Sequence, residues 1–354
     1  MASGCARHLG LPAVALLTGL CVSAAAPETC ANNECQKVEA PVLLQQSSSM
    51  TRGSCAPLPY NAPEGTNCPR TPWIDEMVEA DHSPGKIVMD VGCNKGDDAV
   101  EWLERWDQSG TFWSKKAWVD LYTEKFGMGD AYACGRPDVQ GFKRAASLSG
   151  GNAFGGSSVV CVEPMHENVN LLEKAAKELG YDRPGRHGSF TVVQAALADK
   201  AGKNETVEFP DGKPGQEDLG LTLVERQHVK LSTVDLLAAD LKLPRIDILT
   251  IDTEGADPSV LAGASAMLAS VRYLEFEVHR DLKETAWGRT SLHSVVTSLD
   301  KLGFECYWAG NSGVLISMNR CWTTGFEQGA WANAACVKRT DMWAPILEKH
   351  TQAS

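Results

Sequence analysis

Lys86-Ile-Val-Met-Asp-Val-Gly-Cys-Asn-Lys-Gly96 is the stretch of sequence that decides the fold. Its first half is an apolar run typical of a buried β-strand, and a turn containing Gly92 and Gly96 follows it. An amphipathic segment from Asp97 to Trp106 comes next and predicts a helix. A strand, a glycine turn and a helix in this order indicate a nucleotide-binding βα unit. Glycines let the backbone approach a ligand, and the start of a helix offers free N–H groups.

The turn differs from the G-x-G-x-x-G fingerprint of dinucleotide-binding proteins, because Asn94 occupies the position of the second glycine. Asp90, at the end of the strand, would repel a pyrophosphate but suits a ligand that carries positive charge. S-adenosylmethionine (SAM), with its sulfonium and ammonium groups, is such a ligand. We therefore predict that Asp90, Gly92, Asn94 and Gly96 contribute to a SAM site.

A second strand, Ser158 to Glu163, is predicted before Pro164 and a helix from His166 to Leu179. A carboxylate at the end of this strand can accept both hydroxyl hydrogens of an adenosine ribose. The alternative is that Glu163 caps the following helix or is a surface charge. We favour the ribose role, because the carboxylate lies at the ligand-facing end of an adjacent strand.

Three more strands are predicted, near residues 190–194, 246–251 and 273–279. Ala195 and Ala196 follow the first of these and are small enough to leave room for a flat ring. Asp257 is predicted to be the N-cap of a helix that begins at Pro258. The carboxyl ends of parallel strands meet at one edge of a sheet, so these segments should converge on one crevice. The side chains expected there, besides those already named, are Pro164, Asp252, Glu254, Glu277 and His279.

Several motifs together resemble the FkbM-type SAM-dependent methyltransferases, a class I Rossmann-like family that mostly methylates hydroxyl oxygens of sugars and natural products. They are, in order, Asp-Val-Gly-Cys-Asn-Lys-Gly (90–96), Val-Glu-Pro (162–164), Ala-Ala-Leu-Ala-Asp (195–199), Leu-Ser-Thr-Val-Asp (231–235), Ile-Asp-Thr-Glu-Gly-Ala (251–256) and Val-Leu-Ala-Gly-Ala (260–264). The resemblance covers residues 86–317 and implies an α/β fold: a doubly wound, mostly parallel seven-stranded sheet with a C-terminal antiparallel hairpin. Cys93 stands where the family usually has alanine, and Thr250 where it usually has lysine.

The chain is predicted to comprise a signal peptide (1–25), a cysteine-rich extension (26–72), a methyltransferase domain (73–318) and a tail that wraps the domain (319–354). An insert, 107–156, separates the first helix from the second strand. Aromatic residues at near-helical spacing around its start favour core packing. The alternative is a substrate cap in which Trp113 and Trp118 stack on sugar rings, because long insertions often form lids.

The signal peptide is inferred from Arg7, the apolar run Leu9 to Val22 and the small residues that follow. The run is short and contains Pro12, so stable membrane insertion is not expected after cleavage, although an uncleaved anchor is an alternative. We therefore expect a protein of the secretory lumen or a secreted one. The sequon Asn204-Glu205-Thr206 predicts glycosylation in that compartment.

Of the 12 cysteines, Cys5 and Cys21 lie in the leader, and ten remain. Cys93 and Cys161 fall in predicted core elements and are expected to be free thiols. The other eight are expected to form disulfides, with Cys321 and Cys336 fastening the tail. These eight are Cys30, Cys35, Cys55, Cys68, Cys134, Cys306, Cys321 and Cys336. Zinc is disfavoured, because the mature chain has no Cys/His pair at ligand spacing.

The net charge of −12, without a Lys/Arg-rich run, disfavours nucleic acid as a partner. A small-molecule or glycan hydroxyl is the expected methyl acceptor, and a base must take its proton. His279 is the preferred base, with Asp252 and Glu254 as the other predicted catalytic residues. We predict no metal, although Asp235, Asp252 and Glu254 could together hold a divalent cation. A non-catalytic secreted binding protein and, less favoured, a nicotinamide oxidoreductase are the alternative functions. The oligomeric state is not determined by the sequence.

Overall fold

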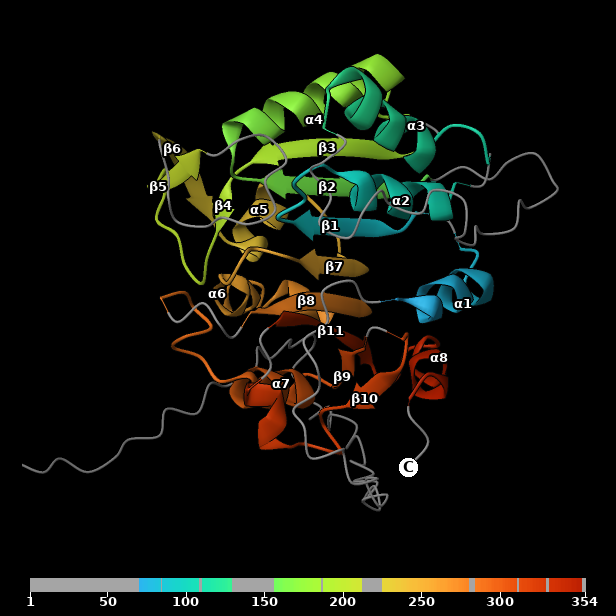
Figure 1. Cartoon of the computed structure of the whole chain (residues 1–354), viewed down its shortest axis with the longest axis vertical. Helices are drawn as coiled ribbons and strands as arrows, with labels where there is room; N and C mark the ends of the chain where they lie inside the picture. Colours follow the sequence, from blue (N-terminus) through green and yellow to red (C-terminus); the bar gives the residue numbers. More distant parts are fainter. Residues whose placement is uncertain are drawn as a thin grey trace, which may run out of the picture. The chain divides into compact units, whose positions relative to one another are not determined.

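The fold, obtained as a computed structural model, is described for residues 70–83, 85–107, 110–128, 156–185, 187–211, 225–279, 284–310, 312–328 and 331–351. All of them lie in one unit, Thr51–Ser354. An eight-stranded sheet with the order β10-β9-β11-β8-β7-β1-β2-β3 runs through its centre (Figure 1). Its strands are β1 (Ile87–Val91), β2 (Ser158–Glu163), β3 (Ser189–Gln194), β7 (Ile248–Ile251), β8 (Tyr273–His279), β9 (Phe304–Ala309), β10 (Leu315–Ser317) and β11 (Trp331–Lys338).

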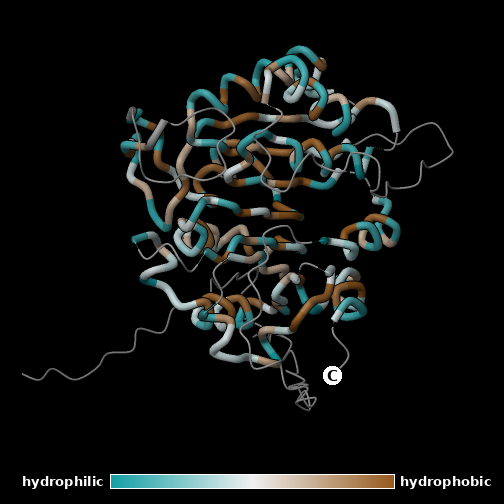
Figure 2. The backbone as a smooth tube through the Cα atoms, in the orientation of Figure 1, coloured by the Kyte–Doolittle hydropathy of each residue, from teal (hydrophilic) through white to brown (hydrophobic). Residues whose placement is uncertain are grey.

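Helices cover both faces of this sheet, because side chains alternate along each strand and both sets are apolar. On β2, Val159 and Cys161 face one core cluster, whereas Val160 and Val162 face the other. The first cluster is closed by α1 (Pro72–Ala80), α2 (Asp97–Arg105), α3 (Lys115–Asp120), α4 (His166–Leu179) and α8 (Ala344–Lys349). The second is closed by α5 (Val234–Asp240), α6 (Asp257–Ala262) and α7 (Leu292–Lys301). The hydropathy colouring shows the apolar strands between these layers (Figure 2).

The strand order and directions confirm the predicted doubly wound α/β class, with one strand more than expected. β3, β2, β1, β7 and β8 are mutually parallel. β11 is antiparallel to both β8 and β9, and β10 pairs with β9 in the predicted antiparallel hairpin. Residues 331–338, which we expected in a wrapping tail, are therefore a central strand. Their backbone bonds to two neighbours, and five of their side chains are buried.

A small three-stranded sheet lies beyond the carboxyl end of β3 (Figure 1). It consists of β4 (Ala196–Leu197), β5 (Thr206–Asp211) and β6 (Glu225–Ser232). β5 and β6 form an antiparallel hairpin. β4 joins β6 in parallel and thereby anchors the hairpin to the turn after β3.

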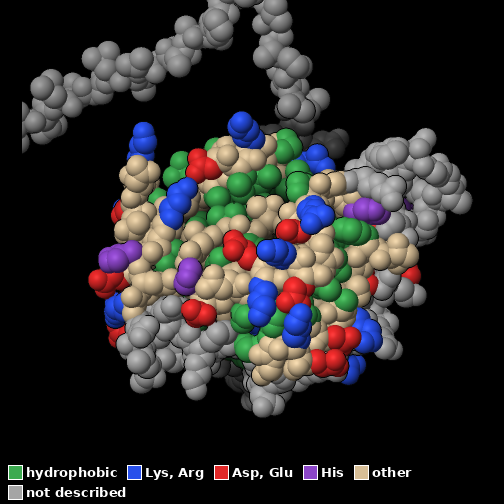
Figure 3. Space-filling view, turned by 90° about the horizontal axis from the view of Figure 1, so that it is seen from above, with side chains coloured by type: hydrophobic (Ala, Val, Ile, Leu, Met, Phe, Trp, Pro, Cys, Tyr) green, Lys and Arg blue, Asp and Glu red, His purple; other side chains and the backbone are tan. Residues whose placement is uncertain are grey.

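Charged side chains of both signs are interspersed on the face of the molecule seen from the α3–α4 end (Figure 3). Among the described residues, no helix has both the length and the apolar character needed to cross a lipid bilayer.

Candidate active site

The turn after β1 follows an unusual backbone path at the carboxyl edge of the sheet. Gly92 has φ +84°, and a Cβ atom there would lie 1.7 Å from the carbonyl oxygen of Asp252. Its N–H donates to the carbonyl of Val162 at 2.8 Å. Asn94 also adopts a left-handed conformation, with φ +43°. The turn is thus wedged between β2 and β7 where only glycine fits, and strain of this kind concentrates at ligand sites.

Glu163 at the end of β2 is bound to this turn. Its carboxylate accepts the Asn94 N–H at 2.9 Å and the Met165 N–H at 2.8 Å. The side chain is 4% exposed, and burial raises its pKa to about 7. The N-cap of α4 is Met165, so Glu163 does not cap that helix with its side chain. Each carboxylate oxygen retains further acceptor capacity toward a ligand. The carbonyl of the adjacent Pro164 accepts from Gln194 and Gln227, at 3.3 Å each.

Asp90 ends its strand beside Thr250 of β7, where the resembling family usually has lysine. The Thr250 hydroxyl donates to Asp90 at 2.7 Å. Burial, together with the charges of Asp98, Asp97 and Glu163, raises the pKa of Asp90 to about 7. With a hydroxyl as the neighbour in place of an ammonium group, Asp90 has no cation paired with it among the described side chains. This arrangement suits a positively charged ligand.

The two alanines of the predicted adenine region lie at the turn between β3 and β4. Ala195 is 2% exposed and belongs to the core cluster, and Ala196 is 9% exposed. Both follow the carboxyl end of β3, and both are buried, so their side chains leave little room for a ring from solvent.

Four carboxylates gather at the ends of β7 and β8 and at the start of α6, which we call the acidic cluster: Asp252, Glu254, Asp257 and Glu277. Asp252 is solvent-exposed, and the negative charges of Glu254, Asp257 and Asp90 raise its pKa. Asp257 is the first residue of α6, whose N-cap is Ala256, one residue before the predicted cap.

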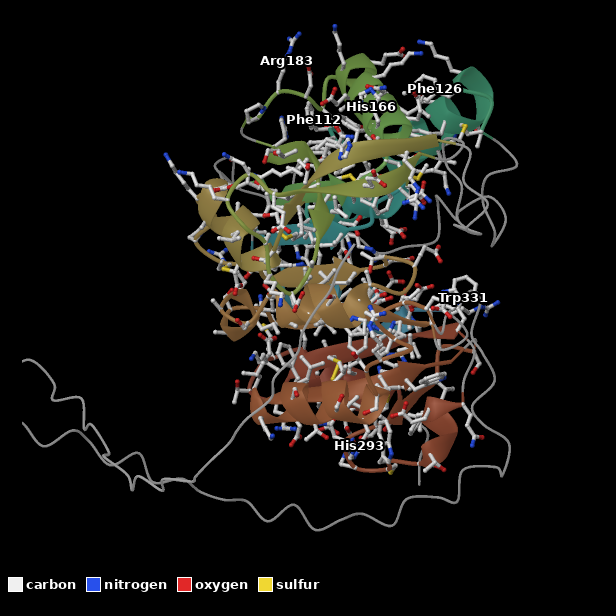
Figure 4. The ribbon with its side chains drawn as sticks, turned by 90° about the vertical axis from the view of Figure 1, so that its left-hand side faces the viewer. Phe112, Phe126, His166, Arg183, His293 and Trp331 are labelled. Carbon is white, nitrogen blue, oxygen red and sulfur yellow. A yellow bond between two sulfur atoms is a disulfide. The ribbon has the colours of Figure 1, made fainter. Side chains whose placement is uncertain are left out.

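His279 faces the acidic cluster. Its Nδ1 atom lies 3.6 Å from Glu254 and 3.9 Å from Glu277. Both distances exceed a hydrogen bond, and Nδ1 is buried without a partner. Trp331 of β11, labelled in Figure 4, is the register partner of His279 and packs with a ring-centroid distance of 6.3 Å. Glu254 is held in a left-handed conformation, with φ +50°, which brings its side chain to this group.

Asp235 is not part of this cluster. Its carboxylate accepts the N–H groups of Ala266 and Met267 at 2.9 Å each, and a hydroxyl hydrogen from Ser265. It therefore stabilises the turn before the short helix η2 (Met267–Ala269). The predicted alternative of a cation between Asp235, Asp252 and Glu254 is not supported, because these bonds occupy Asp235.

The described part of the insert packs on the sheet and does not cap the crevice. Trp113 and Trp118 are 1% and 0% exposed and belong to the core, so they are not available to stack on sugar rings. The Trp118 indole N–H donates to the Lys95 carbonyl at 2.7 Å, which connects the insert to the turn at residues 92–96, called the ligand turn below. Lys115, also buried, forms ion pairs with Asp98 and Glu101 of α2. These supports were missed by the sequence analysis, since spacing alone does not show which turn an aromatic residue contacts.

The disulfides differ from our prediction in two places. Cys93 and Cys161, expected to be free thiols, are paired across β1 and β2, with their Cα atoms 5.5 Å apart. Cys336 pairs with Cys306 on the neighbouring strand and not with Cys321. Cys321 is itself disulfide-bonded. The remaining cysteines (Cys30, Cys35, Cys55, Cys68 and Cys134) lie outside the described residues.

Comparison with known proteins agrees with this geometry. The family model described as "Methyltransferase FkbM domain" matches residues 134–306. The match begins after the 90–96 motif and ends within β9, so it is shorter than the region over which we noted the resemblance. A search of curated proteins gave no match.

Two solved structures are similar at low identity. A methyltransferase FkbM from Methylobacillus flagellatus KT has 12% identity and a TM-score of 0.36, with 72% of this chain and 44% of that chain covered. A precorrin-6y C5,15-methyltransferase from Geobacter metallireducens GS-15 has 9% identity and a TM-score of 0.31, with 75% and 86% covered. The chain thus spans less than half of the first protein's length.

The sheet order and the helices on both faces define a doubly wound, Rossmann-like α/β fold. Within it, residues 134–306 match the family model for the FkbM methyltransferase domain.

Proposed function

We propose that this protein transfers a methyl group from SAM to a hydroxyl oxygen of a sugar, glycan or other small molecule. The observation that carries the proposal is the convergence of three features at one sheet edge. These are the strained glycine turn at 92–96, the buried carboxylates Asp90 and Glu163, and the acidic cluster with His279.

The residues at this edge fit SAM. Bound SAM supplies an activated methyl group on a sulfonium. Gly92 and Gly96 let the backbone approach the ligand, and Glu163 has acceptor capacity for a ribose diol. Asp90 offers a carboxylate beside Thr250 that favours a positive group. Pro164, Ala195 and Ala196 follow the carboxyl ends of β2 and β3, beside Glu163.

Removal of the acceptor's proton requires a base near the point of attack. His279 and Asp252 both lie at the ends of strands beside the turn. The Nδ1 atom of His279 faces Glu254 and Glu277, which leaves its other ring nitrogen as the one that could accept a proton. Asp252 follows β7 directly and is exposed, so an acceptor hydroxyl could reach its carboxylate.

The compartment is part of the proposal. The leader-like residues 1–25 and the disulfide pairs support a protein that folds in the secretory lumen and acts there or after secretion. A small-molecule or glycan acceptor fits that location, and the mixed charges of Figure 3 offer no feature that would favour nucleic acid.

Calorimetric titration with SAM and with NAD tests the cofactor. We expect SAM to bind one site and NAD to give no heat of binding. Glu163→Gln should weaken SAM affinity on the order of 10- to 100-fold, because it removes charge-assisted bonds to the diol. Glutamine is preferred to alanine, since its amide oxygen preserves a bond to the Asn94 N–H. Glu275→Gln, at a half-buried glutamate already bonded to Tyr273 and Asn333, is the matched control. Tight NAD binding would favour an oxidoreductase instead.

A methyl-transfer screen with labelled SAM over isolated glycans and small polyols tests the reaction. Transfer to a hydroxyl oxygen supports the proposal. SAM binding without transfer to any acceptor class would favour the alternative of a non-catalytic binding protein.

A further inference from the structure

Glu277 is a buried glutamate whose charge nothing in the described structure balances. Its side chain is 1% exposed, and neither carboxylate oxygen has a hydrogen-bond partner. Glu275, two residues earlier on the same face of β8, is half-buried and accepts from the Tyr273 hydroxyl at 2.6 Å and from the Asn333 amide at 2.9 Å. The two residues share a strand, a face and a chemical type. Glu277 interacts with Trp331 and Asp252 but makes no hydrogen bond of normal geometry, whereas buried carboxylates normally do.

His279 presents a second unpartnered atom to the same point. Its Nδ1 is buried without a hydrogen bond, 3.9 Å from Glu277 and 3.6 Å from Glu254. One ligand atom from each of these three side chains lies within 4.8 Å of the others. Glu254 reaches the group only through its left-handed backbone, which is a conformation that costs energy.

We propose that Glu254, Glu277 and His279 bind a divalent transition-metal ion. Two carboxylate oxygens and one imidazole nitrogen form a mixed donor set that Mn²⁺ and Zn²⁺ accept, whereas Mg²⁺ prefers oxygen ligands alone. Ligands about 2.1 Å from a tetrahedral ion lie about 3.4 Å from each other. The separations from His279 Nδ1, 3.6 and 3.9 Å, exceed that value by about half an ångström or less, and the two carboxylates lie within 4.8 Å of each other. Three protein ligands leave an open coordination position, as in catalytic metal sites.

The acidic cluster gives an independent electrostatic reason. Asp252 and Asp257 add two more carboxylates around Glu277. No lysine or arginine among the described residues forms an ion pair with Glu254, Glu277 or Asp252. A bound cation removes both the repulsion and the unmet hydrogen-bonding capacity.

The catalytic part of this inference rests on the proposed methyl transfer, and a metal at this site changes the role of His279 in that reaction. A metal on Nδ1 makes the histidine a ligand and leaves its other ring nitrogen protonated, so it cannot act as the base. Asp252, exposed beside the site, then accepts the proton. An acceptor hydroxyl at the open position loses its proton more readily, because a bound cation lowers the pKa of an oxygen it coordinates.

The test is metal binding by the full chain after removal of metals with a chelator. Mn²⁺ is titrated and followed by the loss of its free-ion electron paramagnetic resonance signal. Zn²⁺ is then added as a competitor and Mg²⁺ as a hard-cation control. We expect one Mn²⁺ per chain, displaced by Zn²⁺ and not by equimolar Mg²⁺. Glu277→Gln and His279→Gln should each weaken Mn²⁺ binding at least tenfold.

Two matched controls separate ligand loss from general damage. Glu275→Gln, on the same strand, and His293→Gln, which alters a histidine packed on Trp322, should bind Mn²⁺ as the wild type does. In the metal-free protein, Glu277→Gln should not lower the melting temperature, because it neutralises an unbalanced buried carboxylate. A structural role would lower it. Absence of saturable Mn²⁺ and Zn²⁺ binding in the wild type, or equal binding by Glu277→Gln, would overturn the proposal.

The same samples keep the two proposals distinguishable. SAM calorimetry on the metal-free protein reports on the cofactor site alone, since Asp90 and Glu163 are not ligands of the ion. Metal binding without SAM binding would leave the metal site standing and overturn the methyltransferase proposal, and the reverse result would do the opposite.

Discussion

The amino ends and the carboxyl ends of the strands in the main sheet hold buried charges in opposite ways. At the amino ends of the strands, Lys86 and Arg272 directly precede β1 and β8. Lys86 pairs with Asp81 at 3.2 Å, and Arg272 bonds to Asp81 at 2.8 Å and to Asp341 at 2.6 Å. We call these four residues the amino-end ion cluster. At the carboxyl ends, the acidic cluster has four carboxylates and only His279 beside it.

The difference separates carboxylates that stabilise the fold from carboxylates that bind a ligand under our proposals. Hydrogen bonds from Ser83 and Arg272 and the charge of Lys86 outweigh the opposing effect of burial and lower the pKa of Asp81 to about 2. Burial and like charges raise the pKa values of Asp90 and Glu277 instead, and like charges raise that of Asp252. Carboxylates of the first kind stabilise the fold, whereas those of the second kind cost stability until a cation or cationic ligand balances them.

Removal of a charge from the paired edge should have the largest effect on stability. Arg272→Ala leaves Asp81 and Asp341 without their guanidinium and removes its contact with the Trp343 ring, whose centroid is 3.8 Å away. We expect the free energy of unfolding, measured in urea, to fall by about 3 kcal/mol. Arg183→Ala, at a side chain that is 87% exposed, should change it by less than about 0.5 kcal/mol. Equal effects of the two substitutions would remove the contrast between a structural cluster and surface charge.

At the carboxyl ends of the strands, the conformation of the backbone should have the largest effect on SAM binding. Gly92→Ala places a methyl group 1.7 Å from the Asp252 carbonyl and should weaken SAM binding at least 100-fold, or about 2.7 kcal/mol. Gly180→Ala is the matched control, since Gly180 also has a positive φ, +73°, but open space around the added atom. That control should lose only about 1–2 kcal/mol of stability and keep SAM affinity. If both variants bind SAM normally, the turn is not part of the site.

The pH dependence of unfolding should have opposite signs at the two edges. The pKa values of Asp90 and Glu163 are raised to about 7, so their stabilising contribution is complete below about pH 4 and is lost as the pH rises through 7. The pKa of Asp81 is lowered, so its contribution is lost as the pH falls toward 2. Between pH 4 and 8 the free energy of unfolding should fall on the order of 1–3 kcal/mol.

Urea denaturation at pH 3, 5 and 8 measures this dependence. The double variant Asp90→Asn with Glu163→Gln should flatten the decline between pH 5 and 8 and leave the acid limb unchanged. A wild-type protein that grows steadily more stable up to pH 8 would contradict the raised pKa values.

The smallest expected effect concerns the support of the ligand turn. Trp118→Phe keeps an aromatic ring but removes the bond to the Lys95 carbonyl, which should cost about 1 kcal/mol of stability and weaken SAM binding a few-fold. Trp343→Phe is the control, because the Trp343 indole N–H is buried without a partner. It should leave SAM affinity unchanged. Identical behaviour of the two variants would show that the insert does not position the turn.

Much of the fold followed from local patterns that tertiary contacts reinforce. The bounds of β2 and α4 match the predicted ones, since an uninterrupted apolar run ends in Glu163-Pro164 and an amphipathic segment ends before Gly180. β11 was missed because Trp331-Ala-Asn-Ala-Ala-Cys-Val-Lys338 is rich in alanine, which has low β propensity. Its strand character comes from two neighbours that lie far away in the sequence.

The site was predictable to the level of strand ends and no further. Asp90, Glu163, Asp252 and His279 all lie at the carboxyl edge, as the strand-end rule predicts. The roles that depend on side-chain orientation could not be predicted. No sequence pattern shows that Glu275 accepts two hydrogen bonds whereas Glu277 accepts none of normal geometry. The Cys93–Cys161 pair was missed for a related reason. Cys93 and Cys161 are 68 residues apart in the sequence. Their contact depends on the register of β1 and β2, which places Asp90 opposite Cys161.

The position of β11 has a consequence for biosynthesis. Because β11 lies between β8 and β9, the last third of the sheet cannot close until residue 338 has left the ribosome. Until then β8 and β9 present open edges, which are templates for aggregation. A chain that stalls or is truncated after β10 would thus expose the unpaired edges of β8 and β9. The Cys306–Cys336 bridge links β11 to β9 covalently, so it fastens the strand that is added last.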